Sequence, residues 1–159
     1  MFRNWLSKKL RPENQVRQVA VYLLEDRAIV VPKLGLGGAN FIMEPIFVGE
    51  DSPDVIQDLV LSGLAESRLD DRPIESMADS EDFKAAQKAL FRAAGVRSWR
   101  ALQRAAVFCS VVQRGQDFEV LPYKRAKTGG GYEGAGQPQT FNDDSILGDM
   151  VLRLLRSSS

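Results

Sequence analysis

The stretch that decides the fold is VIQDLVLSGL at residues 55–64, because a second version of it, ILGDMVLRLL, begins at residue 146, 91 positions later. The apolar residues of both stretches recur three and four positions apart, which predicts two amphipathic helices. A repeat near 90 residues exceeds the period of roughly 20–50 residues typical of solenoids and propellers. The sequence therefore predicts two related half-units that share one core.

A pair of apolar, β-branched runs precedes each helix and predicts a hairpin. The runs span residues 19–24 and 27–31 in the first half, and 107–112 and 118–121 in the second. Shorter extended pieces follow at 41–48 and 139–141. Pro32 and Pro122 have no N–H for a sheet ladder, so each is expected to end its strand or to lie on an edge. Each half is thus expected to run strand, strand, short strand, helix.

The segment between the halves, residues 69–106, predicts two more helices. Asp79 or Ser80 can cap the first, and Gly95 is placed as its C-terminal stop. Ser98 can cap the second. The large apolar residues of this segment predict an insert that packs on the sheet.

With 159 residues and 44% apolar composition, the chain can bury one sizeable core. We expect a single α+β domain over residues 1–159, in which an antiparallel or mixed sheet carries packed helices. Its expected parts are a half-repeat at 17–68, the helical insert at 69–106 and a half-repeat at 107–156. No run has the apolar length of a signal peptide core or a membrane span, so we expect a cytoplasmic protein.

The amino-acid composition excludes several kinds of catalytic and metal site. The chain has no histidine, which excludes serine or cysteine triads with a histidine base and zinc sites built on histidine. The single Cys109 lies inside an apolar run, so we interpret it as a buried structural thiol. We expect no catalytic residues, no cofactor and no metal ligands.

Two Gly-rich segments invite a phosphate-binding interpretation. GLGGAN at residues 35–40 nearly matches a dinucleotide fingerprint, but the extended residues after it favour a plain turn over the required helix. The second segment carries Lys124, Arg125 and Lys127 before three glycines, and a solvated hairpin tip is favoured over a phosphate cradle. The acidic pairs Asp70-Asp71 and Asp143-Asp144 are interpreted as solvated or capping residues, against a metal-dependent nuclease site.

Charge is distributed unevenly although the net charge is zero. Residues 44–82 hold twelve acidic and two basic residues. A solvated surface and a surface for a basic partner both fit this block, since opposed potentials speed association. The second interpretation predicts partner-binding residues, which we place at Glu50, Asp51, Asp54, Asp70, Asp71 and Glu75.

Three features together resemble the immunity proteins of bacterial contact-dependent growth inhibition (CDI) systems. They are the strand that ends in LPYKR at 121–125, the Gly-rich GGGYEG at 129–134 and the closing helix that opens with ILGDMV at 146–151. Pro32 with its glycines, the helix at 55–68 and the GVRSW motif at 95–99 also resemble that family, so the resemblance spans residues 17–156. It implies a cytoplasmic, non-enzymatic protein that binds and neutralises the C-terminal domain of a cognate toxin, often a nuclease, and we expect no direct binding to nucleic acid or to a membrane. The alternative is a non-catalytic scaffold or adaptor of a bacterial secretion or regulatory system.

Overall fold

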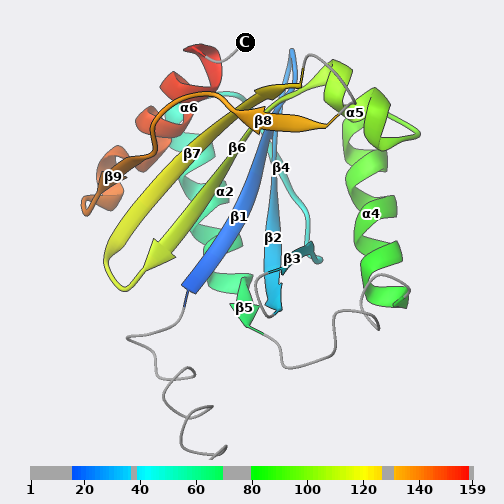
Figure 1. The fold of residues 1–159 in the computed structure, drawn as a ribbon, viewed down its shortest axis with the longest axis horizontal. Helices are drawn as coiled ribbons and strands as arrows, with labels where there is room; N and C mark the ends of the chain where they lie inside the picture. The colour runs from blue at the N-terminus through cyan, green and yellow to red at the C-terminus, as the bar shows by residue number, and fades with distance from the viewer. Residues whose placement is uncertain (1–15, 37–38, 70–79, 127–130, 158–159) are drawn as a thin grey trace, which may run out of the picture.

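The fold is α+β, with one curled sheet and helices on both of its faces, as expected from the sequence (Figure 1). The computed structural model describes residues 16–36, 39–69, 80–126 and 131–157. In chain order the described elements are β1 (Val16–Leu23), β2 (Ala28–Leu36), β3 (Ala39–Ile42), β4 (Phe47–Gly49), α2 (Pro53–Glu66), β5 (Arg68–Leu69), α4 (Glu81–Ala94), α5 (Trp99–Ala105), β6 (Val107–Arg114), β7 (Asp117–Arg125), β8 (Tyr132–Gly134), β9 (Gln139–Phe141), the 3-10 turn η2 (Asp144–Ile146) and α6 (Leu147–Ser157).

The sheet has the strand order β3-β2-β1-β6-β7-β8. The short strands β4 and β5 also pair with β2, and β9 pairs with β7. Neighbouring strands in the described residues are antiparallel, apart from the two-residue parallel contact of β5 with β2. The expected antiparallel or mixed sheet is confirmed.

The two hairpins have the same register. Val19 pairs with Pro32 in the first hairpin and Cys109 pairs with Pro122 in the second, so each position has its equivalent 90 residues later. Strands β1 and β6 join the hairpins, and their pairing is centred on Ala20 opposite Ser110. These two residues are themselves 90 positions apart, so an approximate twofold axis passes between them. The exact limits of the two half-repeats stay a prediction.

Of the two alternatives expected for Pro32 and Pro122, the strand end is wrong, because β2 and β7 both continue through them. The edge position is observed, because neither proline is paired with an outer strand. At each proline the outer neighbour of the strand changes, from β4 to β3 along β2 and from β9 to β8 along β7. The proline carbonyls still accept hydrogen bonds, from Met43 N at 2.9 Å and from Ala135 N at 3.0 Å. A residue without an N–H is tolerated where one outer partner ends and the next begins.

The third extended piece is also more divided than expected. In the first half it forms two strands, β3 and β4, on either side of a cis peptide bond before Pro45. In the second half β8 precedes β9, although the sequence predicted only the piece at 139–141. Each half therefore runs through four strands before its helix.

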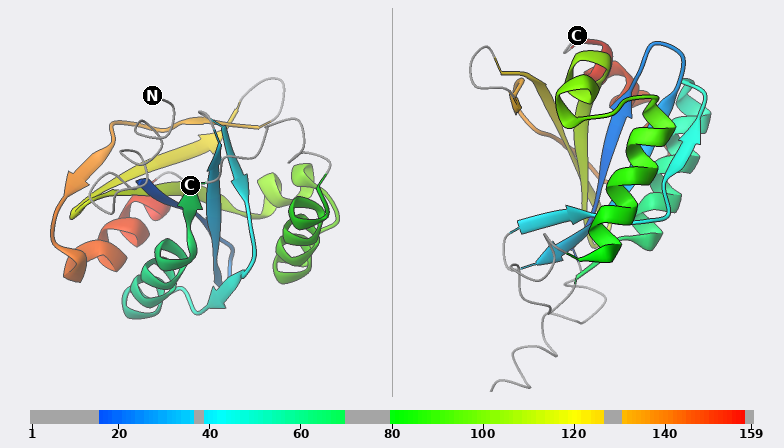
Figure 2. Two further views of the ribbon diagram at one scale, coloured as in Figure 1. Left: turned by 90° about the horizontal axis from the view of Figure 1, so that it is seen from below. Right: turned by 90° about the vertical axis from the view of Figure 1, so that its right-hand side faces the viewer.

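Helices α2 and α6 cover the same face of the sheet and lie side by side (Figure 2, left). Their fully buried positions are equivalent at an offset of 91: Ile56 with Leu147, Val60 with Val151, and Leu64 with Leu155. Other apolar residues at the helical spacing predicted from the sequence are less buried. Val55, Leu59, Met150 and Leu154 are half-buried, and Ile146 is 38% exposed.

The first turns of α2 and α6 cross in close contact. A side chain at Gly148 would collide with the carbonyl oxygen of Pro53, and its Cβ would lie 2.9 Å from Cβ of Gln57. The Gln57 carboxamide nitrogen also donates to the carbonyl oxygens of Ser145 at 3.0 Å and Asp144 at 3.2 Å, just before α6. Glycine at position 148 thus lets the two helix starts approach each other.

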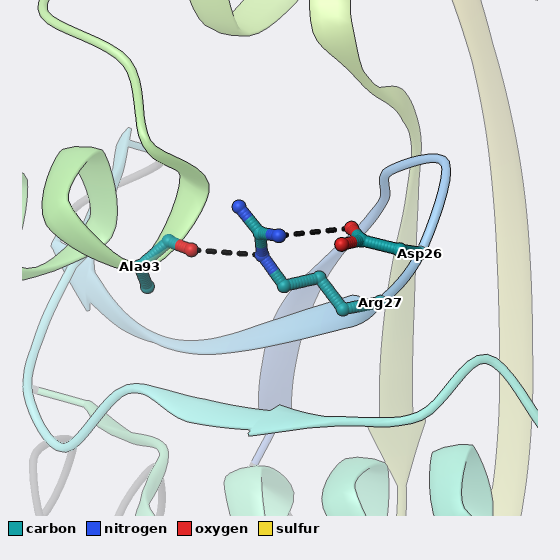
Figure 3. Close-up of polar contacts among 3 residues, drawn as sticks. All are labelled: Asp26, Arg27 and Ala93. Carbon is teal, nitrogen blue, oxygen red and sulfur yellow. Dashed lines mark hydrogen bonds and ion pairs between the residues drawn. The ribbon is translucent and has the colours of Figure 1, made fainter.

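The insert helices α4 and α5 pack on the opposite face of the sheet. Ser80 and Ser98 cap them, and Gly95 ends α4 with a φ of 70°. Arg27, in the turn between β1 and β2, fixes the last turn of α4: its guanidinium donates to Ala93 O at 3.0 Å and pairs with Asp26 at 2.8 Å (Figure 3).

Trp99 differs from the expectation that the large apolar residues of the insert are buried. It remains 37% exposed. Its ring meets Phe91 edge to face at 5.1 Å, and its Nε1 donates to Gln87 at 3.1 Å. These two contacts hold it at the corner between α4 and α5, outside the core.

Candidate functional site

The crossing of α2 and α6 brings acidic residues of the two halves together. Pro53 and Gln57 of α2 contact Gly148 of α6, so the two helix starts, which carry the flanking acidic residues, lie against each other. We call the surface around this contact the acidic crossing and define it by Glu50, Asp51, Asp54, Asp58, Asp143, Asp144 and Asp149. Asp51 is half-buried and the others are exposed.

Helix α2 contains no basic residue, whereas α6 carries Arg153 and Arg156 in its later turns. Neither residues 34–67 nor residues 128–152 include a lysine or an arginine. The first turns of the two helices are therefore acidic, and the nearest cation along α6 is Arg153, about one helical turn beyond Asp149. Such a surface attracts a basic partner and speeds the encounter in a salt-dependent way.

Some of these acidic residues lie at helix starts, where they also stabilise the helices. Ser52 accepts from Val55 N at 3.4 Å at the start of α2, where Asp54 lies in the first turn. Asp143 accepts from the backbone N and the hydroxyl of Ser145, at 2.9 and 2.6 Å. These hydrogen bonds hold the pKa of Asp143 below its ordinary value. Acidic residues at helix starts also interact favourably with the helix dipole.

An apolar side chain lies within the acidic crossing. Ile146 is 38% exposed, and its neighbours along the chain include Asp144 and Asp149. An exposed apolar residue close in sequence to acidic residues is compatible with a protein-binding patch, in which an apolar contact has a polar rim.

The sequence-predicted partner residues divide into two groups. Glu50, Asp51 and Asp54 lie at the start of α2, in the acidic crossing. Asp70, Asp71 and Glu75 lie outside the described residues. Sequence reasoning assigned Asp143 and Asp144 to capping and missed that they lie beside α2. The 91-residue offset was the signal, since it makes residue 144 the equivalent of Pro53.

The two Gly-rich segments form no phosphate cradle in the part of the chain that the structure describes. Gly35 and Asn40 pair with each other between β2 and β3, so a strand and not a helix follows. In the second hairpin, Lys124 pairs with Glu133 at 3.7 Å, and Arg125 donates to the carbonyl oxygen of Arg104. Lys127 lies outside the described residues.

An aromatic cluster with one lysine occupies the sheet face that carries α4 and α5. The ring of Phe108 lies 5.0 Å from that of Tyr22, 4.9 Å from Tyr123 and 5.2 Å from Tyr132, and Lys33 Nζ lies 5.6 Å from its centroid. Burial lowers the pKa of Lys33 and raises that of Tyr22. Burial also raises the pKa of Tyr132 to about 12, against the opposing charge of Arg125.

Cys109 has a structural role in the core. Cys109 is fully buried between the sheet and the helices α2 and α6, and burial raises the pKa of its thiol. Among the described residues, no three acidic or cysteine side chains are grouped to hold a metal ion. Within the same residues, no helix has the length and apolar character needed to cross a membrane.

The fold is shared with two solved structures. One is a protein of unknown function, NMB0488, from Neisseria meningitidis, with a TM-score of 0.71 and 17% identity over 91% of this chain and 96% of that chain. The other is a chain from the CdiA-CT/CdiI toxin and immunity complex of Yersinia pseudotuberculosis, with a TM-score of 0.68 and 15% identity over 90% of this chain and 97% of that chain. No protein-family model matches the sequence, and no curated protein matches it.

Proposed function

We propose that this protein is a CDI immunity protein, which binds the toxin domain of its cognate system and neutralises it in the cytoplasm. The observation that carries the proposal is the fold likeness to a chain of a toxin and immunity complex, which extends over 90% of this chain and 97% of the other. A likeness of this extent covers both half-units and the insert between them.

The side chains favour the immunity role over the toxin role. A toxin that cleaves its target needs groups that transfer protons or hold a metal. Here histidine is absent from the sequence, the cysteine is buried, and Asp143 is engaged in capping. The chain is therefore proposed to act by binding, without catalysis.

The proposed contact surface is the acidic crossing, extended by Asp70, Asp71 and Glu75. Its charge fits a basic partner, and a nuclease that binds nucleic acid through a basic groove is the partner class we propose. Ile146 would supply an apolar contact, and the carboxylates of the acidic crossing would increase the association rate.

The first experiment is co-purification of this chain with the C-terminal domain encoded by the gene directly upstream. A stable complex, together with protection of cells that express the toxin domain, is the expected result. If no complex forms and no protection is seen, the scaffold or adaptor alternative takes precedence.

Charge reversal then tests the surface. Changing Asp54 and Asp144 together to lysine should slow association and reduce protection while the protein stays folded, because both side chains are exposed. Asp70 and Asp71 form a second pair for the same change. The matched control changes Glu25 and Asp117 to lysine, since both are exposed acids in the hairpin turns. If binding is insensitive to salt and to these reversals, but is lost on changing Lys124, Arg125 and Lys127, the interface lies on the second Gly-rich hairpin.

A further inference from the structure

The outer side of the insert helices carries a second charged surface, opposite in sign to the acidic crossing. The sequence contains no aspartate or glutamate from residue 83 to residue 116. The basic residues of α4, α5 and their connection are all exposed, and with Trp99 they define the basic helical face: Lys84, Lys88, Arg92, Arg97, Arg100 and Arg104.

Helical spacing places these cations in rows. Lys84, Lys88 and Arg92 follow one another at intervals of four residues on α4, as Arg100 and Arg104 do on α5. Four residues advance an α-helix by about 6 Å, so each row presents regularly spaced positive charges. In the view along the right-hand side of the molecule, α4 lies in front of the other elements (Figure 2, right).

Among the described residues, an ion pair reaches one cation of this face. Glu81 approaches Lys84 at 3.7 Å, and Asp26 pairs with Arg27 beside the end of α4. Both side chains of the Lys84–Glu81 pair are exposed, so the attraction between their charges is weak, as in most exposed ion pairs.

Trp99 is fixed beside the cation row of α4. It is held by Gln87 and Phe91, which lie three positions after Lys84 and Lys88 on the same helix. Residues at this spacing are neighbours on a helix surface. The indole is thus anchored on two sides and still more than a third exposed, next to regularly spaced cations.

We propose that the basic helical face binds single-stranded nucleic acid, with the cations on the phosphates and Trp99 stacked on a base. A positively charged track combined with an exposed aromatic ring is the recognition mode of single strands. Tryptophan and arginine are also enriched in protein interfaces, so an acidic protein is the alternative occupant that the experiment must separate. The rows of regularly spaced cations favour a phosphate chain. This inference is independent of the proposed toxin contact, because α4 and α5 lie on the opposite face of the sheet from α2 and α6.

Fluorescence provides the test. Trp5 and Trp99 are the two tryptophans, so in a Trp5→Phe background the emission comes from Trp99 alone. A labelled single-stranded oligonucleotide of roughly 12 nucleotides should bind and quench this emission. The logarithm of the binding constant should fall with the logarithm of salt concentration, with a slope of about −0.7 for each phosphate neutralised.

Variants separate stacking from charge. Trp99→Ala should weaken oligonucleotide binding about 5- to 100-fold, while Trp99→Phe should retain most of it. Changing Lys88 and Arg92 to alanine should weaken binding and reduce the salt slope, whereas Arg153→Ala, an exposed cation on α6, should leave both unchanged.

Three results would overturn the proposal: no oligonucleotide binding at low salt, equal binding by Trp99→Ala, or equal binding of a poly-glutamate chain. The last would assign the face to an acidic protein. Toxin binding by the same variants, measured in parallel, keeps this outcome separate from that of the proposed function.

Discussion

Ala20 and Ser110 face each other across strands β1 and β6 at the centre of the approximate twofold axis, and they differ by one hydroxyl group. Both are buried, with exposures of 0% and 1%. Among the described residues, Ser110 Oγ has no hydrogen-bond partner. The two halves therefore place an alanine and an unsatisfied serine at equivalent positions.

This difference predicts opposite effects of two matched substitutions. Ser110→Ala removes a buried polar group without a partner, so the free energy of unfolding should rise by up to about 1 kcal/mol. Ala20→Ser adds such a group at the equivalent position and should lower it by about 1–3 kcal/mol. Urea unfolding of both variants measures the two values. A loss of stability in Ser110→Ala would mean that the hydroxyl has a partner in solution.

The crossing of α2 and α6 predicts that Gly148 cannot carry a side chain. In Gly148→Ala the new methyl group would collide with the Pro53 carbonyl oxygen, and backbone atoms cannot easily move away. The free energy of unfolding should fall by at least about 1–3 kcal/mol. The matched control is Gly134→Ala, because a Cβ at Gly134 meets no atom within 4 Å. Equal stability of the two variants would contradict the close approach of the helices.

Equivalent leucines of the repeated helices should contribute similarly. Leu64 of α2 and Leu155 of α6 are 1% and 0% exposed, and each change to alanine should cost about 2–5 kcal/mol. Leu59→Ala should cost less, because Leu59 is half-buried at the side of α2. Thermal and urea unfolding of the three variants compare these costs. A large difference between Leu64→Ala and Leu155→Ala would mean that the two halves do not share the core equally.

Sequence reasoning recovered those parts of the fold that depend on local patterns. The helices at 55–64 and 146–155 were predictable because apolar residues recur along a single helix, and Gly95 because it allows a left-handed stop. Strand ends were less predictable. Whether Pro32 ends β2 depends on which strand lies beside it, and that is set by the tertiary fold.

The candidate site was predictable only in part, for the same reason. The charge count identified Glu50, Asp51 and Asp54, since they are close together in the sequence. Asp143 and Asp144 join them because two helices 91 residues apart cross at Gly148, a contact that no local pattern contains. The position of Lys33 above Phe108 likewise depends on the packing of strands from both halves.

Lys33 predicts a pH-dependent contribution to stability. Burial lowers its pKa in the folded protein below the value of about 10.4 that lysine has when unfolded. Between these two pKa values the unfolded state binds more protons, so this contribution to stability rises with pH across that interval and is least favourable below it. Lys33→Met keeps the apolar stem and removes the charge, so this variant should be more stable than the parent at pH 7.

The advantage of Lys33→Met should shrink as the pH approaches about 10, because the parent then buries a neutral amine. Tyr22 and Tyr132 also have raised pKa values, but they are present in both proteins and their effects largely cancel in the difference. Urea unfolding at the two pH values measures this difference in stability, with Lys88→Met as the exposed control. If Lys33→Met is instead less stable than the parent at pH 7, the attraction between the ammonium group and the Phe108 ring exceeds the cost of burying the charge.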